Sequence, residues 1–342
     1  MENYELLKER EMNRDFLKIF CEFKEVSLRY DPQHRAIWCY YNPRIRPCFS
    51  ATMLRELRQV QQGIIDYFAA KDKDEEPLIR YQILHSQIPG IFNLGGDLAL
   101  FSQLIRQKNR SLLHDYAKRC IDVCYLNSIN LNLPITTISL VEGSALGGGF
   151  ESALSSNILI ATEDAEMGFP EIRFNLFPGM GAYSLLARHL GMRTAEQIIT
   201  SGETYSARRL HEMGIVHRLA KPGQGIECVE DFMRKHSLLG NGFRALQQVR
   251  QYYNGMNYRE LEVIVELWVD AAMRLEEKDL RLIDRLVKAQ STKMAAMKEQ
   301  PLKRTKQDRR FVTGRAAFPL TDRNGEIVLV DRRVNPDRRL YN

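Results

Sequence analysis

The stretch from Val141 to Gly181 constrains the fold of this chain more than any other. A β-branched run that ends at Val141 leads into the triplet Gly147–Gly149, and a short apolar, helix-like run follows. A strand that turns through glycines into a helix exposes consecutive backbone N–H groups, and glycine lets a ligand approach them closely. Two interpretations stay open on the glycines alone: a site for phosphate, carboxylate or an oxyanion, or a tight turn without a ligand.

A second glycine pair, Gly95-Gly96, also follows an apolar segment and precedes a helical pattern. Two such loops can each direct one N–H group at the same oxygen, which is the geometry of an oxyanion hole. Neither loop has the spacing of a dinucleotide-binding fingerprint or of a phosphate-binding loop with its lysine. Glu151 and Glu171 are the carboxylates that accompany the glycines. Taken alone, structural roles are favoured for both: Glu151 as a charge near a helix N-terminus and Glu171 as a loop carboxylate.

Strand-like and helix-like segments alternate over residues 25–220, which predicts an α/β fold, and helical patterns follow. We expect one helix from the Gly95-Gly96 break to Leu126, a loop opening at Pro170-Glu171, a helix over 226–235, and two long amphipathic helices within 258–290. The predicted organisation is an N-terminal arm (1–24), a core (25–225), a C-terminal helical region (226–295) and a basic tail (296–342).

The pattern of glycine loop, glutamate and Pro-Glu resembles the crotonase (enoyl-CoA hydratase/isomerase) superfamily. The matching segments are GGDL at 95–98, ALGGGFE at 145–151, FPEI at 169–172 and PGMG at 178–181. The resemblance covers roughly residues 25–225. It implies a spiral of ββα units with a C-terminal α-helical region, and a homo-oligomer, either a trimer or a hexamer.

Further segments are similar to the diffusible-signal-factor synthases, quorum-sensing members of this superfamily that make cis-2-unsaturated fatty acids. These segments are FNLGGDLALF (92–101), ALGGGFESALS (145–155), FPGMGAYS (177–184), LWVDAAM (267–273) and DRLVKAQS (284–291). This resemblance implies dehydration of a 3-hydroxyacyl thioester on acyl carrier protein, followed by thioester hydrolysis that releases the fatty acid. The alternatives are an enoyl-CoA hydratase or isomerase of fatty-acid metabolism, and a non-catalytic crotonase relative that only binds.

The resemblance also assigns roles to residues. The N–H groups of Gly96 and Gly148 would hold the thioester oxygen, while Glu151 and Glu171 would share acid–base catalysis, with either one as the acid. The residues expected to line the substrate site are Gly95, Trp268, Leu286, Phe92 and Met180. Ordinary helix packing is the alternative for Trp268 and Leu286. We expect no metal and no cofactor other than the acyl carrier protein or CoA of the substrate.

The charge is concentrated in the tail. Residues 301–342 contain eleven Lys or Arg against five Asp or Glu, and the whole chain has a net charge of +6. The tail is expected to be a solvated extension, a docking element for acyl carrier protein, or a contact for a two-component sensor regulator. The doubled Asp-Arg-Arg at 331–333 and 337–339 argues against binding of nucleic acid. A charged N-terminus, scattered cysteines and the lack of a long apolar run predict a cytoplasmic protein without membrane contact.

Overall fold

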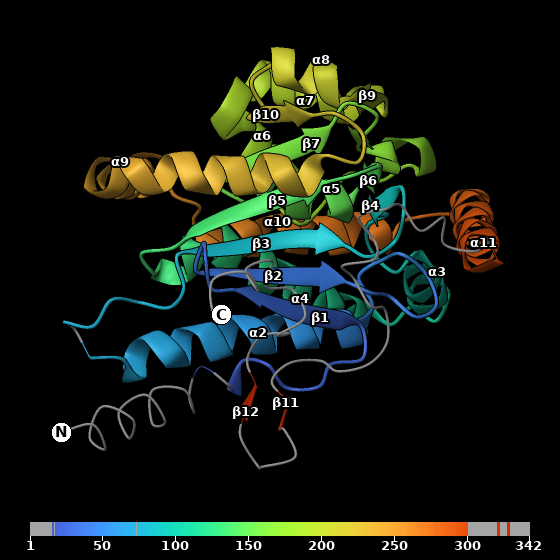
Figure 1. The fold of residues 1–342 in the computed structure, drawn as a ribbon. Coiled ribbons are helices and arrows are strands. Elements are labelled where there is room, and N and C mark those ends of the chain that lie inside the picture. Colours follow the sequence, from blue (N-terminus) through green and yellow to red (C-terminus); the bar gives the residue numbers. More distant parts are fainter. Residues whose placement is uncertain (1–15, 17, 73, 300–319, 322–326, 329–342) are drawn as a thin grey trace.

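Two β-sheets form the centre of the protein (Figure 1). The structure is a computed structural model, and it describes residues 16, 18–72, 74–299, 320–321 and 327–328. The larger sheet has the strand order β1 (Val26–Asp31), β2 (Ala36–Tyr41), β3 (Tyr81–Ser86), β5 (Thr136–Val141), β7 (Ile158–Thr162) and β10 (Arg218–Ala220). The smaller one has the order β4 (Ile91–Asn93), β6 (Ser144–Leu146), β8 (Glu166–Gly168) and β9 (Thr204–Ser206). The pairs β1–β2 and β8–β9 are antiparallel, and the other pairs within these sheets are parallel.

Consecutive strands alternate between the two sheets. β3, β5 and β7 belong to the larger sheet, and the strands that follow them, β4, β6 and β8, belong to the smaller one. Helical segments connect one such pair to the next: α3 (Leu98–Arg106) and α4 (Arg110–Ser128) after β4, α5 (Gly148–Leu154) after β6, and η2 (Pro170–Phe174) with α6 (Ala182–Leu190) after β8. This repeat of two strands and a helix confirms the predicted α/β spiral.

Both faces of the larger sheet are buried, as the side-chain alternation of a strand requires. On β2, Trp38 and Tyr40 belong to the core that contains Phe232 of α9 (Gly225–Asn254). Cys39 and Tyr41 alternate with them along the strand and belong to the core formed with α2 (Ala51–Ala70) and α4 on the other face. The sheet therefore lies between α9 and the α2–α4 layer (Figure 1).

The remaining described elements are η1 (Asn130–Asn132), α7 (Met192–Ser201), α8 (Ala207–Glu212), α10 (Tyr258–Ala272), α11 (Glu277–Glu299) and the paired strands β11 (Leu320–Thr321) and β12 (Ile327–Val328). The predicted C-terminal helices are confirmed as α10 and α11. α11 packs against α3 and η2, so it returns to the end of the molecule where the smaller sheet lies (Figure 1).

Three predicted elements differ from the structure. The single helix expected up to Leu126 is two helices, because Lys108 adopts a positive φ of 53° and Asn109 caps α4 by accepting from the Leu112 N–H at 3.1 Å. The loop expected at Pro170-Glu171 is the 3₁₀ helix η2, for which proline in the first turn is well suited. The helix expected over 226–235 runs on to Asn254 with a break at Gly240, where φ is 43°.

The predicted chain divisions stay predictions. Of the arm over residues 1–24, Phe16 and Ile19 are buried, and Ile19 packs against Gly63 of α2. The charge run and most of the basic tail over 296–342 lie outside the described residues. None of the helices in the described part of the chain is long and apolar enough to cross a membrane.

Candidate active site

The first glycine loop follows β4 and is held by its own strand. Oδ1 of the buried Asn93 accepts the Gly95 N–H at 2.8 Å, and the Gly95 carbonyl accepts the Phe49 N–H at 2.8 Å. Gly95 has a φ of 95°, a conformation that other residues rarely adopt. The turn leaves the next N–H group, that of Gly96, without an acceptor among the described residues.

The second glycine loop lies directly beside the first. Gly147 has a φ of 54° and precedes Gly148, the first residue of α5. A Cβ atom on Gly148 would lie 3.4 Å from the Cα of Gly95 and 3.4 Å from the N of Gly96. The Gly148 N–H also has no acceptor in the described part of the chain. The fold therefore brings two free backbone donors together from separate loops, as the spacing predicted.

Glu151 lies one turn into α5 and has one oxygen fixed and one free. Its side chain is buried, and Oε1 accepts from the backbone N–H groups of Met180 and Ala182 at 2.8 and 2.9 Å. Oε2 is buried and has no hydrogen-bond partner among the described residues. Burial raises the pKa of Glu151 to about 7, although the two backbone N–H groups favour the charged form.

Glu171 comes from η2 and approaches the second glycine loop. A Cβ atom on residue 147 would lie only 2.3 Å from Oε1 of Glu171, so glycine at this position leaves the space that the carboxyl group occupies. Its Oε2 is buried and has no partner in the described structure. Burial raises the pKa of Glu171 to about 8, and the negative charge of Glu151 acts in the same direction.

A cavity of about 240 Å³ joins these groups. Gly95, Gly96, Gly148, Glu151 and Glu171 all line it. The other predicted substrate residues on its wall are Met180, Trp268 from α10 and Leu286 from α11. The cavity thus brings together the glycines, the carboxyl groups and both C-terminal helices.

Phe92 is the one predicted site residue that lies elsewhere. Its side chain is 1% exposed, packs edge-to-face on Tyr41 at a centroid distance of 5.3 Å, and lines neither of the two cavities described here. Neighbouring side chains of a strand point to opposite faces, and that of Phe92 belongs to the core behind β4. The structure therefore places Phe92 in core packing and not at the substrate cavity.

The Pro-Gly-Met-Gly turn positions both Glu151 and Trp268. The sequence analysis did not predict this role of the turn. A Cβ atom on Gly179 would lie 2.3 Å from the Trp268 ring, so the glycine allows the indole to pack on the backbone. The same ring lies edge-to-face with Phe101, at a centroid distance of 5.1 Å. The glycines of the motif were the available signal, but a close approach between residues 179 and 268 is visible only in three dimensions.

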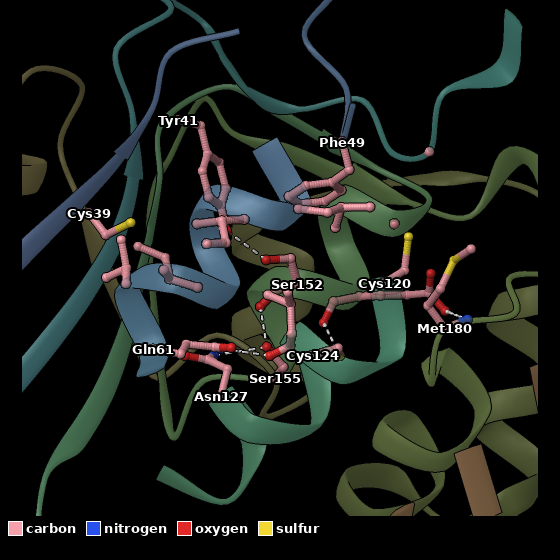
Figure 2. Close-up of a pocket in the computed structure, with 18 of the residues that line it drawn as sticks. Cys39, Tyr41, Phe49, Gln61, Cys120, Cys124, Asn127, Ser152, Ser155 and Met180 are labelled. Carbon is pink, nitrogen blue, oxygen red and sulfur yellow. Dashed lines mark hydrogen bonds between the residues drawn. The ribbon is translucent and has the colours of Figure 1, made fainter. Parts of the chain in front are cut away.

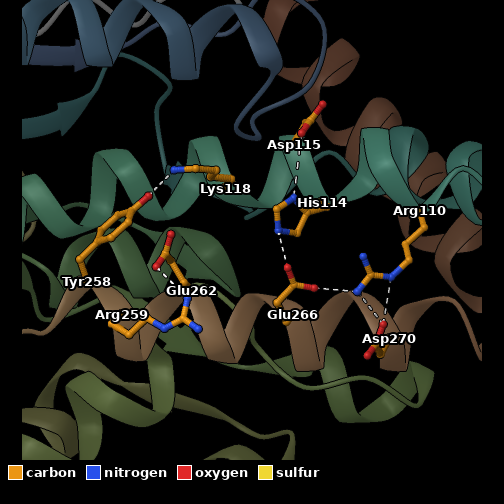
Figure 3. A network of polar contacts seen from close by, with 9 residues as sticks. All are labelled: Arg110, His114, Asp115, Lys118, Tyr258, Arg259, Glu262, Glu266 and Asp270. Carbon is orange, nitrogen blue, oxygen red and sulfur yellow. Dashed lines mark hydrogen bonds and ion pairs between the residues drawn. The ribbon is translucent and has the colours of Figure 1, made fainter.

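Polar contacts hold α10 against α4 (Figure 3). Glu266 of α10 lies 2.6 Å from Nη2 of Arg110 and 2.9 Å from Nε2 of His114, and Asp270 lies 2.8 Å from Arg110. One turn after His114 on α4, Lys118 contacts the Tyr258 hydroxyl group of α10. These contacts flank Trp268, which α10 presents to the opposite, buried side.

A second cavity, which we call the inner cavity, has a volume of about 40 Å³. Figure 2 shows residues that line it. Both cavities are lined by Gly96, Gly148, Glu151 and Met180. In the described residues no group of three or more His, Cys, Asp or Glu side chains is arranged to hold a metal ion. The polar groups that meet at the site are the N–H donors of the glycine loops and the two carboxyl groups.

Comparison with known proteins identifies the same family. The family model of enoyl-CoA hydratase/isomerase matches residues 42–237. The enoyl-CoA isomerase/hydratase fer4 of Mycosarcoma maydis is 30% identical over 182 residues, which is 53% of this chain and 63% of that protein. The mitochondrial methylglutaconyl-CoA hydratase of Mus musculus is 31% identical over 153 residues, 43% of this chain and 44% of that protein. The matched segments thus span less than two thirds of these relatives.

Solved structures share the fold. Human mitochondrial delta3-delta2-enoyl-CoA isomerase superposes with a TM-score of 0.64 at 16% identity, covering 78% of this chain and 99% of that one. An enoyl-CoA hydratase from Bacillus halodurans gives 0.63 at 18% identity, with 76% and 98% covered. With more than half of its length matched by the family model, and with this fold, the chain belongs to the enoyl-CoA hydratase/isomerase family of the crotonase superfamily.

Proposed function

We propose that this protein catalyses the addition of water to an enoyl thioester and the reverse dehydration of a 3-hydroxyacyl thioester. The observation that carries the proposal is a set of four groups around one cavity that have no hydrogen-bond partner in the described part of the chain. Two are the backbone N–H groups of Gly96 and Gly148, and two are the Oε2 atoms of Glu151 and Glu171. Relatives named as CoA hydratases and a CoA isomerase support the same class of substrate.

The glycine N–H groups supply electrostatic stabilisation. When water adds to the double bond, or when an α-proton leaves, negative charge develops on the thioester oxygen as an enolate. Donors that are fixed by the backbone before the reaction need no reorganisation when this charge forms. Each is expected to contribute about 3 kcal/mol of transition-state stabilisation.

The carboxyl groups supply one base and one acid. At neutral pH the raised pKa values of the pair leave it one proton. We place this proton on Glu171, because two backbone N–H groups donate to Glu151 and favour its charged form, and that charge raises the pKa of Glu171. In hydration, Glu151 removes a proton from the attacking water while Glu171 delivers its proton to the α-carbon. In dehydration the steps reverse: Glu171 removes the α-proton, and Glu151 protonates the leaving hydroxyl group. Two protons move in each direction, and the pair holds one proton both before and after the reaction.

A narrower candidate is the synthesis of a diffusible fatty-acid signal. Trp268 and Leu286 come from the two C-terminal segments that resemble the signal synthases, and both line the cavity. In this version the substrate is a 3-hydroxyacyl group on acyl carrier protein, and water cleaves the thioester of the cis-2-enoyl product. The products of that second step are a free fatty acid and the carrier thiol.

Product identity separates the two candidates. The purified protein is incubated with 3-hydroxyacyl and trans-2-enoyl thioesters of CoA and of acyl carrier protein, and acids and thioesters are identified by mass spectrometry. A hydratase interconverts the thioesters and releases no thiol. A signal synthase releases cis-2-enoic acid and an equal amount of free thiol. Absence of any conversion of all four substrates would contradict both.

Two variants test the assignment of the site. Glu151→Gln and Glu171→Gln keep the size of each side chain and remove its acid–base chemistry. We expect each to lower kcat about 10²–10⁴-fold, with the circular dichroism spectrum unchanged. Glu203, an exposed glutamate, provides the matched control as Glu203→Gln. Wild-type turnover in either site variant would show that its carboxyl group is not catalytic.

A further inference from the structure

The inner cavity has an apolar wall and a polar end. Its wall includes Leu54, Leu57 and Val60 of α2, Cys120, Val123 and Cys124 of α4, and Tyr41 and Leu84 of the larger sheet. The polar lining residues are Gln61, Gln82, Asn127, Ser152 and Ser155, in addition to Glu151 at the entrance. Figure 2 shows Gln61 and Asn127 next to each other, on the side of the cavity opposite Met180. Met180 belongs to the wall shared with the substrate cavity.

The depth of the cavity follows from α4. Cys120, Cys124 and Asn127 line it in successive turns of the helix. Cys120 and Asn127 are seven positions apart, which corresponds to about 10 Å along a helix axis. Cys124 also approaches Glu151, with its Sγ 4.0 Å from the Glu151 carbonyl oxygen. The cavity therefore extends along α4, beside the backbone of Glu151.

Three side-chain oxygens that line the inner cavity can accept hydrogen bonds but receive none from the described residues. Oε1 of Gln61, Oε1 of Gln82 and Oδ1 of Asn127 are buried and lack a hydrogen-bond partner among the described residues. All three side chains are at most 2% exposed. A buried carbonyl oxygen without a hydrogen-bond donor destabilises the folded state. Three of them lining one cavity indicate a bound group that donates hydrogen bonds.

Neighbouring contacts identify the oxygen as the unpartnered atom in the side-chain amides of Gln61 and Asn127. Nε2 of Gln61 donates to the Val123 carbonyl oxygen at 2.9 Å, so its Oε1 must be the unpartnered atom. Nδ2 of Asn127 donates to Ser155 Oγ at 2.9 Å, and that hydroxyl group already donates to the Ser152 carbonyl oxygen at 2.7 Å. Ser155 therefore accepts from Asn127, which leaves Oδ1 of Asn127 without a donor.

We infer that the inner cavity binds the far end of an acyl chain that carries a hydroxyl group at its terminus. The apolar wall accommodates the methylene groups, and the amide oxygens of Gln61 and Asn127 accept from the terminal hydroxyl group. A terminal carboxylate has no proton to donate at neutral pH and would meet only acceptors. A terminal ammonium group would be buried without a counter-charge, because no carboxylate lines the polar end. The inference rests on the proposed acyl-thioester site.

Binding of unreactive substrates tests the inference directly. Saturated acyl-CoA thioesters of graded length, each made with a terminal methyl or a terminal hydroxyl group, are titrated into the full-length protein by calorimetry. At the length that reaches the polar end, we expect the hydroxyl-terminated thioester to bind about tenfold more tightly than its methyl-terminated partner. Equal or tighter binding of the methyl-terminated thioester at every length would overturn the inference.

A matched pair of variants locates the effect. Gln61→Met keeps the length of the side chain and removes its acceptor, so it should abolish or reverse the preference for the hydroxyl group. Gln62→Met changes the adjacent, exposed glutamine and should leave the preference unchanged. An unaltered preference in Gln61→Met would refute the role of this residue, and the wild-type comparison alone remains decisive if that variant does not fold.

Turnover of a short substrate separates this inference from the proposed function. Crotonyl-CoA is too short to reach the polar end, so its hydration reports only on the catalytic groups. Hydration of crotonyl-CoA without any hydroxyl preference in binding would refute the inference alone. A hydroxyl preference without turnover of any thioester would leave the binding site in place and refute the proposed catalytic function.

Discussion

At the scale of single residues, the site is defined by polar atoms that the fold leaves free. The backbone uses one oxygen of Glu151 as an acceptor for two N–H groups and leaves the other in the cavity without a partner. Buried polar atoms are almost always hydrogen-bonded in folded proteins. Oε2 of Glu151 and Oε2 of Glu171, the atoms that the proposed reaction needs, are among the exceptions in the described part of the chain.

The pH dependence of catalysis follows from these two carboxyl groups. Hydration needs Glu151 ionised and Glu171 protonated, and the two pKa values are raised to about 7 and about 8. We expect a bell-shaped profile of kcat/KM with its maximum between these values. Activity falls at lower pH because Glu151 becomes protonated, and at higher pH because Glu171 loses its proton. The two apparent pKa values belong to the coupled pair. A flat profile from pH 5 to pH 9 would contradict this acid–base assignment.

The raised pKa of Glu171 also predicts how stability depends on pH. The ordinary pKa of the group is 4.5, and burial in the fold raises it to about 8. Between these values the folded state keeps a proton that the unfolded state has released, so the contribution of this group to stability falls as pH rises. Glu171→Gln removes that contribution.

Denaturant unfolding at pH 5 and pH 9 measures this effect. The difference in the free energy of unfolding, variant minus wild type, should be more positive at pH 9 than at pH 5. Glu203→Gln, which changes an exposed glutamate, should show no such trend. A Glu171→Gln variant whose stability relative to wild type is the same at both pH values would show that the carboxyl group is not buried as described.

At the scale of helices and strands, the site depends on segments distant in sequence. The turn before α6 supplies the N–H groups that hold Glu151, and its Gly179 packs against Trp268 of α10. The exposed ion pairs of Figure 3 between α10 and α4 are each worth at most about 1 kcal/mol. Packing of Trp268, which is 2% exposed, therefore contributes more to the position of α10 than these pairs do.

Gly179→Ala tests the contact between the turn and α10. The new methyl group would lie 2.3 Å from the Trp268 ring, so the turn or the indole must move. Overpacking of this kind typically costs about 1–3 kcal/mol. The displaced turn should also lower kcat, because the Met180 and Ala182 N–H groups would no longer hold Glu151 in place.

Gly242→Ala is the control for that substitution, since a Cβ atom at this position meets no atom within 4 Å. The two variants are compared by denaturant unfolding and by turnover of an enoyl thioester. Wild-type stability together with wild-type kcat in Gly179→Ala would show that the turn does not constrain the site.

Much of the site follows from the sequence because its chemistry is local. The glycine loops, Glu151 and Pro170-Glu171 lie in short motifs, although the loop expected at Pro170-Glu171 is the 3₁₀ helix η2. What could not be predicted depends on contacts between distant segments. The close contact of Gly179 with Trp268 is one example, and the meeting of Gln61 and Asn127 at the inner cavity is another. Phe92 was misplaced because a motif does not show which face of a strand a side chain occupies.

At the scale of the whole molecule, the second half of α9 leaves an apolar surface exposed. After the break at Gly240, four of its large apolar side chains are more than half exposed, and Tyr252 reaches 97%. The other members of this surface are Leu246, Val249 and Tyr253, at 61%, 61% and 88%. Contiguous apolar side chains on a helix are typical of interaction sites. We propose that a second copy of this chain covers them.

Sedimentation equilibrium tests this oligomer. The wild-type protein should be a trimer or a hexamer at micromolar concentration, and the double variant Leu246→Glu with Tyr252→Glu should be a folded monomer. Exposed side chains make few contacts within the chain, so these substitutions should change the free energy of unfolding by only about 0.5 kcal/mol in the monomer. A wild-type protein that is monomeric throughout this concentration range would rule out the proposed interface.

The central claim is that Glu151 and Glu171 together move a proton to and from the α-carbon of a thioester held by Gly96 and Gly148. The most direct measurement is hydration of an enoyl thioester in D₂O, with deuterium at the α-carbon of the 3-hydroxyacyl product followed by mass spectrometry. Wild-type protein should place one deuterium there, and Glu151→Gln and Glu171→Gln should each slow this incorporation about 10²–10⁴-fold. Incorporation at the wild-type rate in either variant would contradict the claim.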